Sequence, residues 1–100
     1  MKNYILDADG QPVPEADLIT WARWFETAER SVARDTVGEV GVSTVFLGLD
    51  HAFGDGPPIL WETMIFGGTH DGYQERYTSR DAALAGHARA VMLAHSGRTQ

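Results

Sequence analysis

The chain of 100 residues contains no cysteine, and its only lysine is Lys2. Without cysteine there are no disulfide bonds and no thiolate metal sites, and a reducing compartment is permitted. No apolar run approaches the ~20 residues that a membrane-spanning helix needs. A run of three apolar residues, Tyr4–Leu6, is followed by Asp7. This start does not fit a secretory signal peptide, so we expect a cytoplasmic protein.

Basic residues are also scarce. Eight Lys and Arg stand against 14 Asp and Glu, which gives a net charge of −6, and the basic residues are scattered along the chain. A phosphate-binding surface needs clustered basic residues, so the composition disfavours a nucleic-acid partner. An acidic excess of this size is typical of a soluble protein, and an acidic surface that imitates DNA phosphates is the alternative.

The remaining composition is that of an ordinary folded protein. Hydrophobic residues make up 43% of the chain and charged residues 22%. This balance lies far from that of disordered chains, and a chain of this length can bury a core of its own. We therefore expect a single domain over residues 1–100.

The first half of the chain predicts a strand, a turn and a long helix. Residues 4–6 favour a strand, Asp7–Gly10 favours a turn, and Pro12 and Pro14 keep the next stretch extended. Helical periodicity over residues 15–34 gathers a broad apolar arc that includes Trp21 and Trp24. The width of this arc predicts that the helix lies across a sheet.

The second half predicts a meander of three strands and a closing helix. Strands are expected over 37–50, 57–68 and 73–77, with a type I′ turn at Asp71–Gly72. A helix over 78–95 is capped by Thr78, with Gly97 as its stop. The sequence therefore predicts an α+β fold of two layers. In it, an antiparallel sheet of three to four strands packs against two helices, in the order β-α-β-β-β-α.

The segment GLDHAFGDGPPILWETM resembles an active site at first reading, because it brings Asp50, His51 and Glu62 close in sequence. If the two central strands pair around this loop, paired positions sum to 107 or 108, and Glu62 lies opposite Val45 or Phe46. Glu62 is then about 17 Å from His51, beyond hydrogen-bonding reach. The histidines are separated in the same way, so we expect no catalytic residue, no metal and no cofactor.

The loop 50–57 is longer than the usual hairpin connection, and long loops commonly carry binding functions. The side chain of Asp50 is expected to close this loop. The candidate binding residues on the loop are Asp50, His51, Phe53 and Asp55. The alternative is a small enzyme or ligand-binding domain that uses this loop with His51.

Both faces of the two central strands carry apolar residues, although two helices on one side can cover one face alone. The second face must be covered by the N-terminal segment, by a second copy or by another protein. We expect a homo-oligomer or a partner-binding face. The residues predicted on it are either Trp61 and Ile65 or Phe46 and Phe66.

Three segments resemble a family of small proteins encoded by bacteriophages, prophages and mobile elements. They are ITWARWFETAERSVARD, VSTVFLGLDHAFGDGPPILWETMIFGG and RYTSRDAALAGHARAV, and the likeness runs over residues 18–91. The resemblance implies a phage accessory protein in the bacterial cytoplasm, without assigning any residue a role. A non-enzymatic protein that binds a host or phage protein, including a defence protein, is the function expected.

Overall fold

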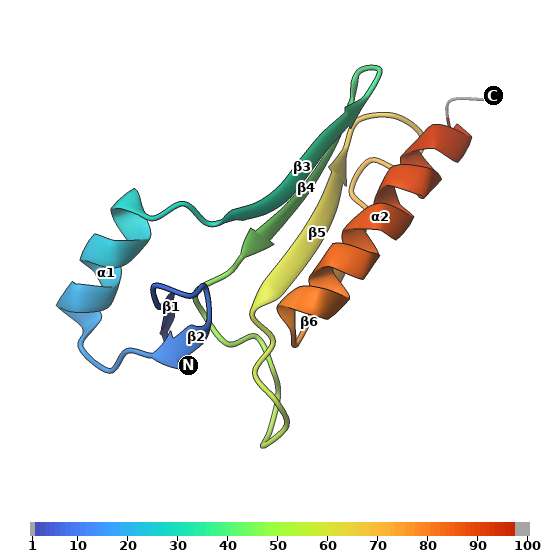
Figure 1. The fold of residues 1–100 in the computed structure, drawn as a ribbon. Helices are drawn as coiled ribbons and strands as arrows, with labels where there is room; N and C mark the ends of the chain where they lie inside the picture. The colour runs from blue at the N-terminus through green and yellow to red at the C-terminus, as the bar shows by residue number, and fades with distance from the viewer. Residues whose placement is uncertain (1, 98–100) are drawn as a thin grey trace.

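The computed structural model describes residues 2–97, and at its centre lies an antiparallel sheet of four strands (Figure 1). The strands lie side by side in sequence order: β3 (Ser31–Val37), β4 (Val40–Phe46), β5 (Trp61–Phe66) and β6 (Gln74–Tyr77). Every second residue of β4 and β5 is buried, from Val40 to Phe46 and from Trp61 to Ile65. Because side chains alternate across a strand, the sheet has one covered face and one open face.

Helix α2 (Arg80–Gly97) runs along the covered face (Figure 1). Its small residues Ala83, Ala90 and Ala94 are buried against the sheet. Gly86 allows the closest approach, because a Cβ at this position would lie 2.1 Å from the hydroxyl oxygen of Tyr77. Burial beneath this helix raises the pKa of Tyr77 to about 12.

Residues 2–28 form an N-terminal arm at one end of the sheet (Figure 1). The arm contains the hairpin of β1 (Tyr4–Leu6) with β2 (Pro12–Pro14), followed by helix α1 (Leu18–Thr27). The side chain of Asp7 accepts hydrogen bonds from two backbone amides of the hairpin turn, and Gly10 has a φ of 78°. The predicted strand at 4–6 and the predicted turn after it are confirmed.

Few contacts attach α1 to the rest of the molecule. The indole N–H of Trp21 donates to the carbonyls of Tyr4 and Gly48, at 3.1 Å each, and the ring of Trp24 meets that of Phe46 edge-on. No residue of α1 is buried, and Leu18 and Ile19 are each 64% exposed. The arm makes the molecule elongated, at 49 × 29 × 21 Å. Its radius of gyration is 14.7 Å, against about 13 Å for a compact chain of this length.

The α+β fold class with an antiparallel four-stranded sheet is confirmed, and the prediction for the first helix needs correction. The helix predicted over 15–34 ends at Thr27, and the following residues form β3. The helix also does not lie across the sheet: it packs against β1 and meets the sheet at the end of β4, where Trp24 contacts Phe46. The physical reason is that β3 pairs along its length with β4, and this ladder satisfies backbone groups that helical periodicity alone assigned to α1.

Two local predictions also differ from the structure. Asp71 does not have the positive φ of a type I′ turn; its carboxylate instead accepts a hydrogen bond from the amide of Gly67 at 2.7 Å, which closes a wider loop. The cap of α2 is Ser79, whose hydroxyl accepts from the amide of Ala82 at 3.1 Å, in place of Thr78. Within residues 2–97, neither helix has the length and apolar content needed to cross a membrane.

Candidate functional site

The connection between β4 and β5 is held together at its base. Beyond the two strands, the amide of Leu47 donates to the carbonyl of Leu60 at 2.6 Å, and that of His51 donates to Ile59 at 3.0 Å. One carboxylate oxygen of Asp50 accepts from the amides of Ala52 and Ile59, at 2.8 and 3.0 Å. The hydrogen bonds from Ala52 and then Ile59 hold the pKa of Asp50 below its ordinary value. The prediction that Asp50 closes this loop is confirmed.

Residues 52–58 extend beyond this base, and we call them the tip loop. The tip loop contains Gly54, with a φ of 80°, and ends in Pro57 and Pro58. Phe53 and Asp55 are exposed, and the side chain of Phe53 is as accessible as in an extended peptide, at 101%. The structure thus holds an exposed aromatic side chain on a loop whose base is fixed.

Within residues 2–97, no hydrogen bond joins the acid and the imidazole at the base of the loop. The Asp50 oxygen that makes its hydrogen bonds is occupied by two backbone amides, and His51 is half-buried next to it in sequence. Glu62 lies opposite Val45 in the sheet, as one of the two predicted registers requires. Its carboxylate accepts from Gln74 and from Arg76, the latter at 2.9 Å. Glu62 therefore belongs to the open face and not to the loop.

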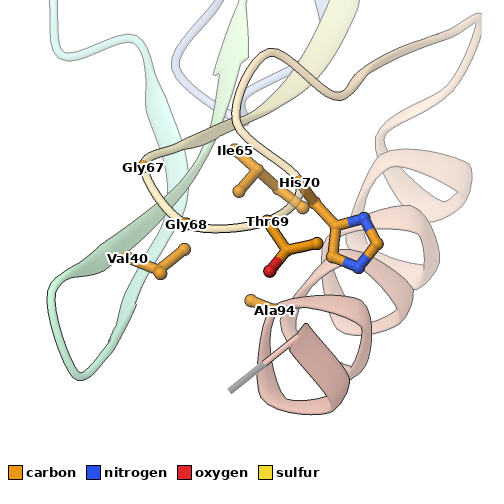
Figure 2. Close-up of a pocket in the computed structure, with 7 residues that line it drawn as sticks. All are labelled: Val40, Ile65, Gly67, Gly68, Thr69, His70 and Ala94. Carbon is orange, nitrogen blue, oxygen red and sulfur yellow. The ribbon is translucent and has the colours of Figure 1, made fainter. Parts of the chain in front are cut away.

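No group of three His, Cys, Asp or Glu side chains within residues 2–97 is placed to hold a metal ion. The pocket in Figure 2 lies under the loop 67–70, where Gly67 to His70 pass over Val40, Ile65 and Ala94. Its volume is about 80 Å³. Sites for ligands of drug size measure ~300–1,000 Å³, so this pocket is too small to hold one.

The prediction that Trp61 and Ile65 lie on a free face is wrong. Trp61 is 3% exposed, in a cluster that joins the arm, the sheet and the start of α2, and Ile65 is fully buried in a cluster with Ala90 and Ala94 of α2. Phe46 shares their face, while Phe66 lies on the open face and is half-exposed. The pairing sums to 107, as in Val42 with Ile65, and this sum puts an odd residue of β5 on the same face as an even residue of β4.

A chain of polar side chains, absent from the sequence-based interpretation, lies between the sheet and α2. Three of its members are buried, and Asp35 at its outer end is exposed. Nε2 of His87 is 2.7 Å from a carboxylate oxygen of Asp35, and Nδ1 is 2.7 Å from the hydroxyl of Thr44. The hydroxyl of Thr44 is in turn hydrogen-bonded to that of Thr63. These four residues come from β3, β4, β5 and α2, and we call them the polar chain. The signal in the sequence was a threonine at a core position of each central strand.

A hydroxyl, an imidazole and a carboxylate in this order also occur in nucleophilic catalysis. Here the hydroxyls of Thr44 and Thr63 belong to fully buried side chains, and His87 is 5% exposed. A nucleophile must reach its substrate, so the arrangement satisfies buried polar groups and fixes the position of α2. A carboxylate oxygen accepts hydrogen bonds, so Nε2 of His87 is the donor toward Asp35, while the hydroxyl of Thr44 is able either to donate to Nδ1 or to accept from it.

The open face of the sheet carries a shallow hollow of about 90 Å³. Its lining residues are Ser43, Val45, Glu62, Met64 and Phe66. A second hollow, of about 200 Å³, lies on the arm between Lys2 and Ala16. Both are surface depressions that suit contact with another surface better than enclosure of a small molecule.

Comparisons of this chain with protein-family models, with curated proteins and with solved structures found no match.

Proposed function

We propose that this protein is a non-catalytic binding protein whose tip loop inserts Phe53 into an apolar pocket of another protein. The observation that carries the proposal is the full exposure of Phe53 on a loop with a closed base. Burying a Phe side chain contributes roughly 1.5–3 kcal/mol. Aromatic anchors of this kind commonly dominate the energy of protein interfaces.

The base of the loop supports this role because it reduces the cost of binding. Asp50 ties Ala52 to Ile59 across the loop, and Pro57 and Pro58 restrict the returning strand. A binding loop that is already ordered loses less conformational freedom in the complex than a flexible one. Asp55, exposed on the same loop, favours a partner pocket with a basic rim.

The resemblance of residues 18–91 to small phage and prophage proteins supports placing this interaction inside a bacterium, with a host or phage protein as the partner. The net charge of −6 supports a protein partner over a nucleic acid. No observation on the loop favours the alternative of an enzyme that uses His51.

The proposal is tested by quantitative affinity capture from bacterial cells, with partners identified by mass spectrometry. The Phe53→Ser variant is expected to lose a partner that the unchanged protein retains. The matched control is Met92→Ser, which removes an exposed apolar side chain from α2, far along the chain from the loop. A partner retained equally by all three proteins would show that Phe53 is not the anchor, and the proposal would then be withdrawn.

A further inference from the structure

The open face of the sheet and the exposed side of α1 are two apolar surfaces that nothing in the described chain covers. Phe66 is 52% exposed, and Val45 and Met64 are half-buried around the hollow beside it. Leu18 and Ile19 project from the first turn of α1 and are among the most exposed large apolar side chains described. Both surfaces occur on every copy of the chain.

We propose that two copies of the chain form a dimer in which α1 of each copy lies on the open face of the other. This inference concerns surfaces separate from the tip loop and does not depend on the function proposed for Phe53. The segment that covers the face is α1 (Leu18–Thr27), and the face it covers is centred on Val45, Met64 and Phe66.

The dimensions of the two surfaces agree. Four strands about 4.8 Å apart, with about 20 Å of strand length, give the open face an area of about 400 Å². Helix α1 has 10 residues, so its length is about 15 Å and its width about 10 Å. The helix therefore fits within the face, with a footprint of about 150 Å².

The area also favours a reciprocal arrangement. Two sheets packed face to face would leave α1 of both copies uncovered. When each copy contributes both a helix and a face, the same contact forms twice, so each partner buries twice the area of a single helix on a single face. The arrangement is also closed under two-fold symmetry, so it stops at two copies.

Charge favours this pairing as well. The start of α1 is acidic, with Glu15 before the helix and Asp17 as its cap. On the open face, Arg34 is exposed at the edge of the sheet and makes no ion pair with any residue in 2–97, while Arg76 lies across from Glu62. Seating α1 with its first turn toward β3 brings the acidic end of one copy near the free cation of the other.

The position of α1 makes this exchange accessible. α1 stands at the end of the molecule, away from α2, and packs against β1 (Figure 1). α1 is attached to the rest of the chain through Trp21 and Trp24, and Leu18 and Ile19 remain 64% exposed beside this attachment. A second copy can therefore meet these side chains without displacing α1 from its own chain.

The first test measures the mass of the intact protein in solution by sedimentation velocity over a range of concentrations. We expect a dimer whose dissociation constant rises at least about tenfold in Leu18→Asp and in Phe66→Lys, since both changes place a charge in the contact. Met92→Asp, a charge at a similarly exposed site on α2, is expected to leave the dimer intact. A monomer at all concentrations up to ~0.5 mM, far above a specific Kd, would overturn the proposal.

The second test establishes which surfaces meet, and the absence of native cysteine makes it clean. An Ile19→Cys chain mixed with a Ser43→Cys chain is expected to form a disulfide-linked pair containing one of each. Neither variant alone is expected to crosslink, because the two-fold arrangement keeps like positions apart. Crosslinking of Ser43→Cys with itself would show sheets packed face to face, and crosslinking of Ile19→Cys with itself would show paired helices; either result contradicts the reciprocal dimer. Circular dichroism confirms that each variant is folded.

Discussion

The layer formed by the sheet and α2 differs from the arm and the tip loop in how far its apolar side chains are buried. The largest fully buried side chains of the described chain lie in β4, in β5 or next to them, among them Phe46, Leu60 and Ile65. In the arm, Tyr4 is buried and α1 has no buried residue, while Phe53 on the tip loop is fully exposed. One part of the molecule holds the fold together, and the other presents apolar side chains to partners.

The largest loss of stability is expected from a change at Phe46, whose side chain contacts both the arm and the sheet. Its ring contacts Trp24 of the arm and Trp61 of the sheet, with ring centroids 5.9 and 5.5 Å away. Replacing Phe46 with alanine leaves a cavity between these two tryptophan rings. The free energy of unfolding is expected to fall by about 3–5 kcal/mol. Urea unfolding followed by tryptophan fluorescence measures the loss.

Phe66→Ala is the matched control, because it removes the same side chain from the open face of the same sheet. At protein concentrations low enough for the chain to be monomeric, the free energy of unfolding is expected to change by less than about 1 kcal/mol, since little buried contact is lost. Equal losses at both positions would show that the open face is as important to the monomer as the covered one. The comparison between the two faces would then not hold.

A smaller effect is expected from breaking the polar chain at Thr44. Thr44→Val keeps the shape of a fully buried side chain and removes the hydroxyl that bonds to His87 and Thr63. Both partners then remain buried with one hydrogen bond fewer. The expected loss is about 1–3 kcal/mol. Thr36→Val, on the exposed part of β3, is the control and is expected to stay within about 0.5 kcal/mol of the unchanged protein.

The double variant Thr44→Val with Thr63→Val separates a hydrogen-bonded chain from simple packing. Once Thr44 is changed, Thr63 has already lost its partner, so its own replacement is expected to cost less than it does alone. Additive losses would mean that the two hydroxyls act independently.

Nitrogen chemical shifts of His87 test the other end of the polar chain. The geometry predicts a ring that carries a proton on Nε2, directed toward Asp35.

Local patterns predicted much of the fold correctly. The turn after Leu6 and the closure of the loop by Asp50 depend on residues close in sequence. The pairing around the loop placed Glu62 opposite Val45 or Phe46, and the structure has Val45. β3 was not predicted, because Val32 and its neighbours also continue the helical periodicity of α1. A single sequence does not show which of two competing patterns the tertiary structure selects.

The surfaces were harder to predict than the elements. Whether Trp61 is buried or free depends on a register sum of 107 or 108, and one residue of slip exchanges the two faces. The apolar arc of α1 predicts that one side of the helix packs against another surface, but the arc does not identify that surface. The polar chain joins residues from four separate elements, including Asp35 and His87, so no local spacing could reveal it.

The smallest effect on the fold is expected at Asp50, where the change is confined to the tip loop. Asp50→Asn replaces a charged acceptor with a neutral one, so the amides of Ala52 and Ile59 are expected to exchange hydrogen several-fold faster while the urea midpoint stays unchanged. Hydrogen bonds from these amides lower the pKa of Asp50 from its ordinary value of 3.8. The closure of the loop by the Asp50 carboxylate is therefore complete above pH 3.8 and is lost as the pH falls through the lowered pKa. Protection of the two amides against hydrogen exchange in the unchanged protein, corrected for intrinsic exchange, should fall over the same pH range. The Asp50→Asn variant should show no such fall.

Asp55→Asn, a charge change at the exposed tip, is the control and is expected to leave the exchange rate of both amides unchanged. If Asp50→Asn also lowered the urea midpoint, the tip loop would unfold together with the sheet as one cooperative unit. The tip loop would then belong to the part of the molecule that stabilises the fold.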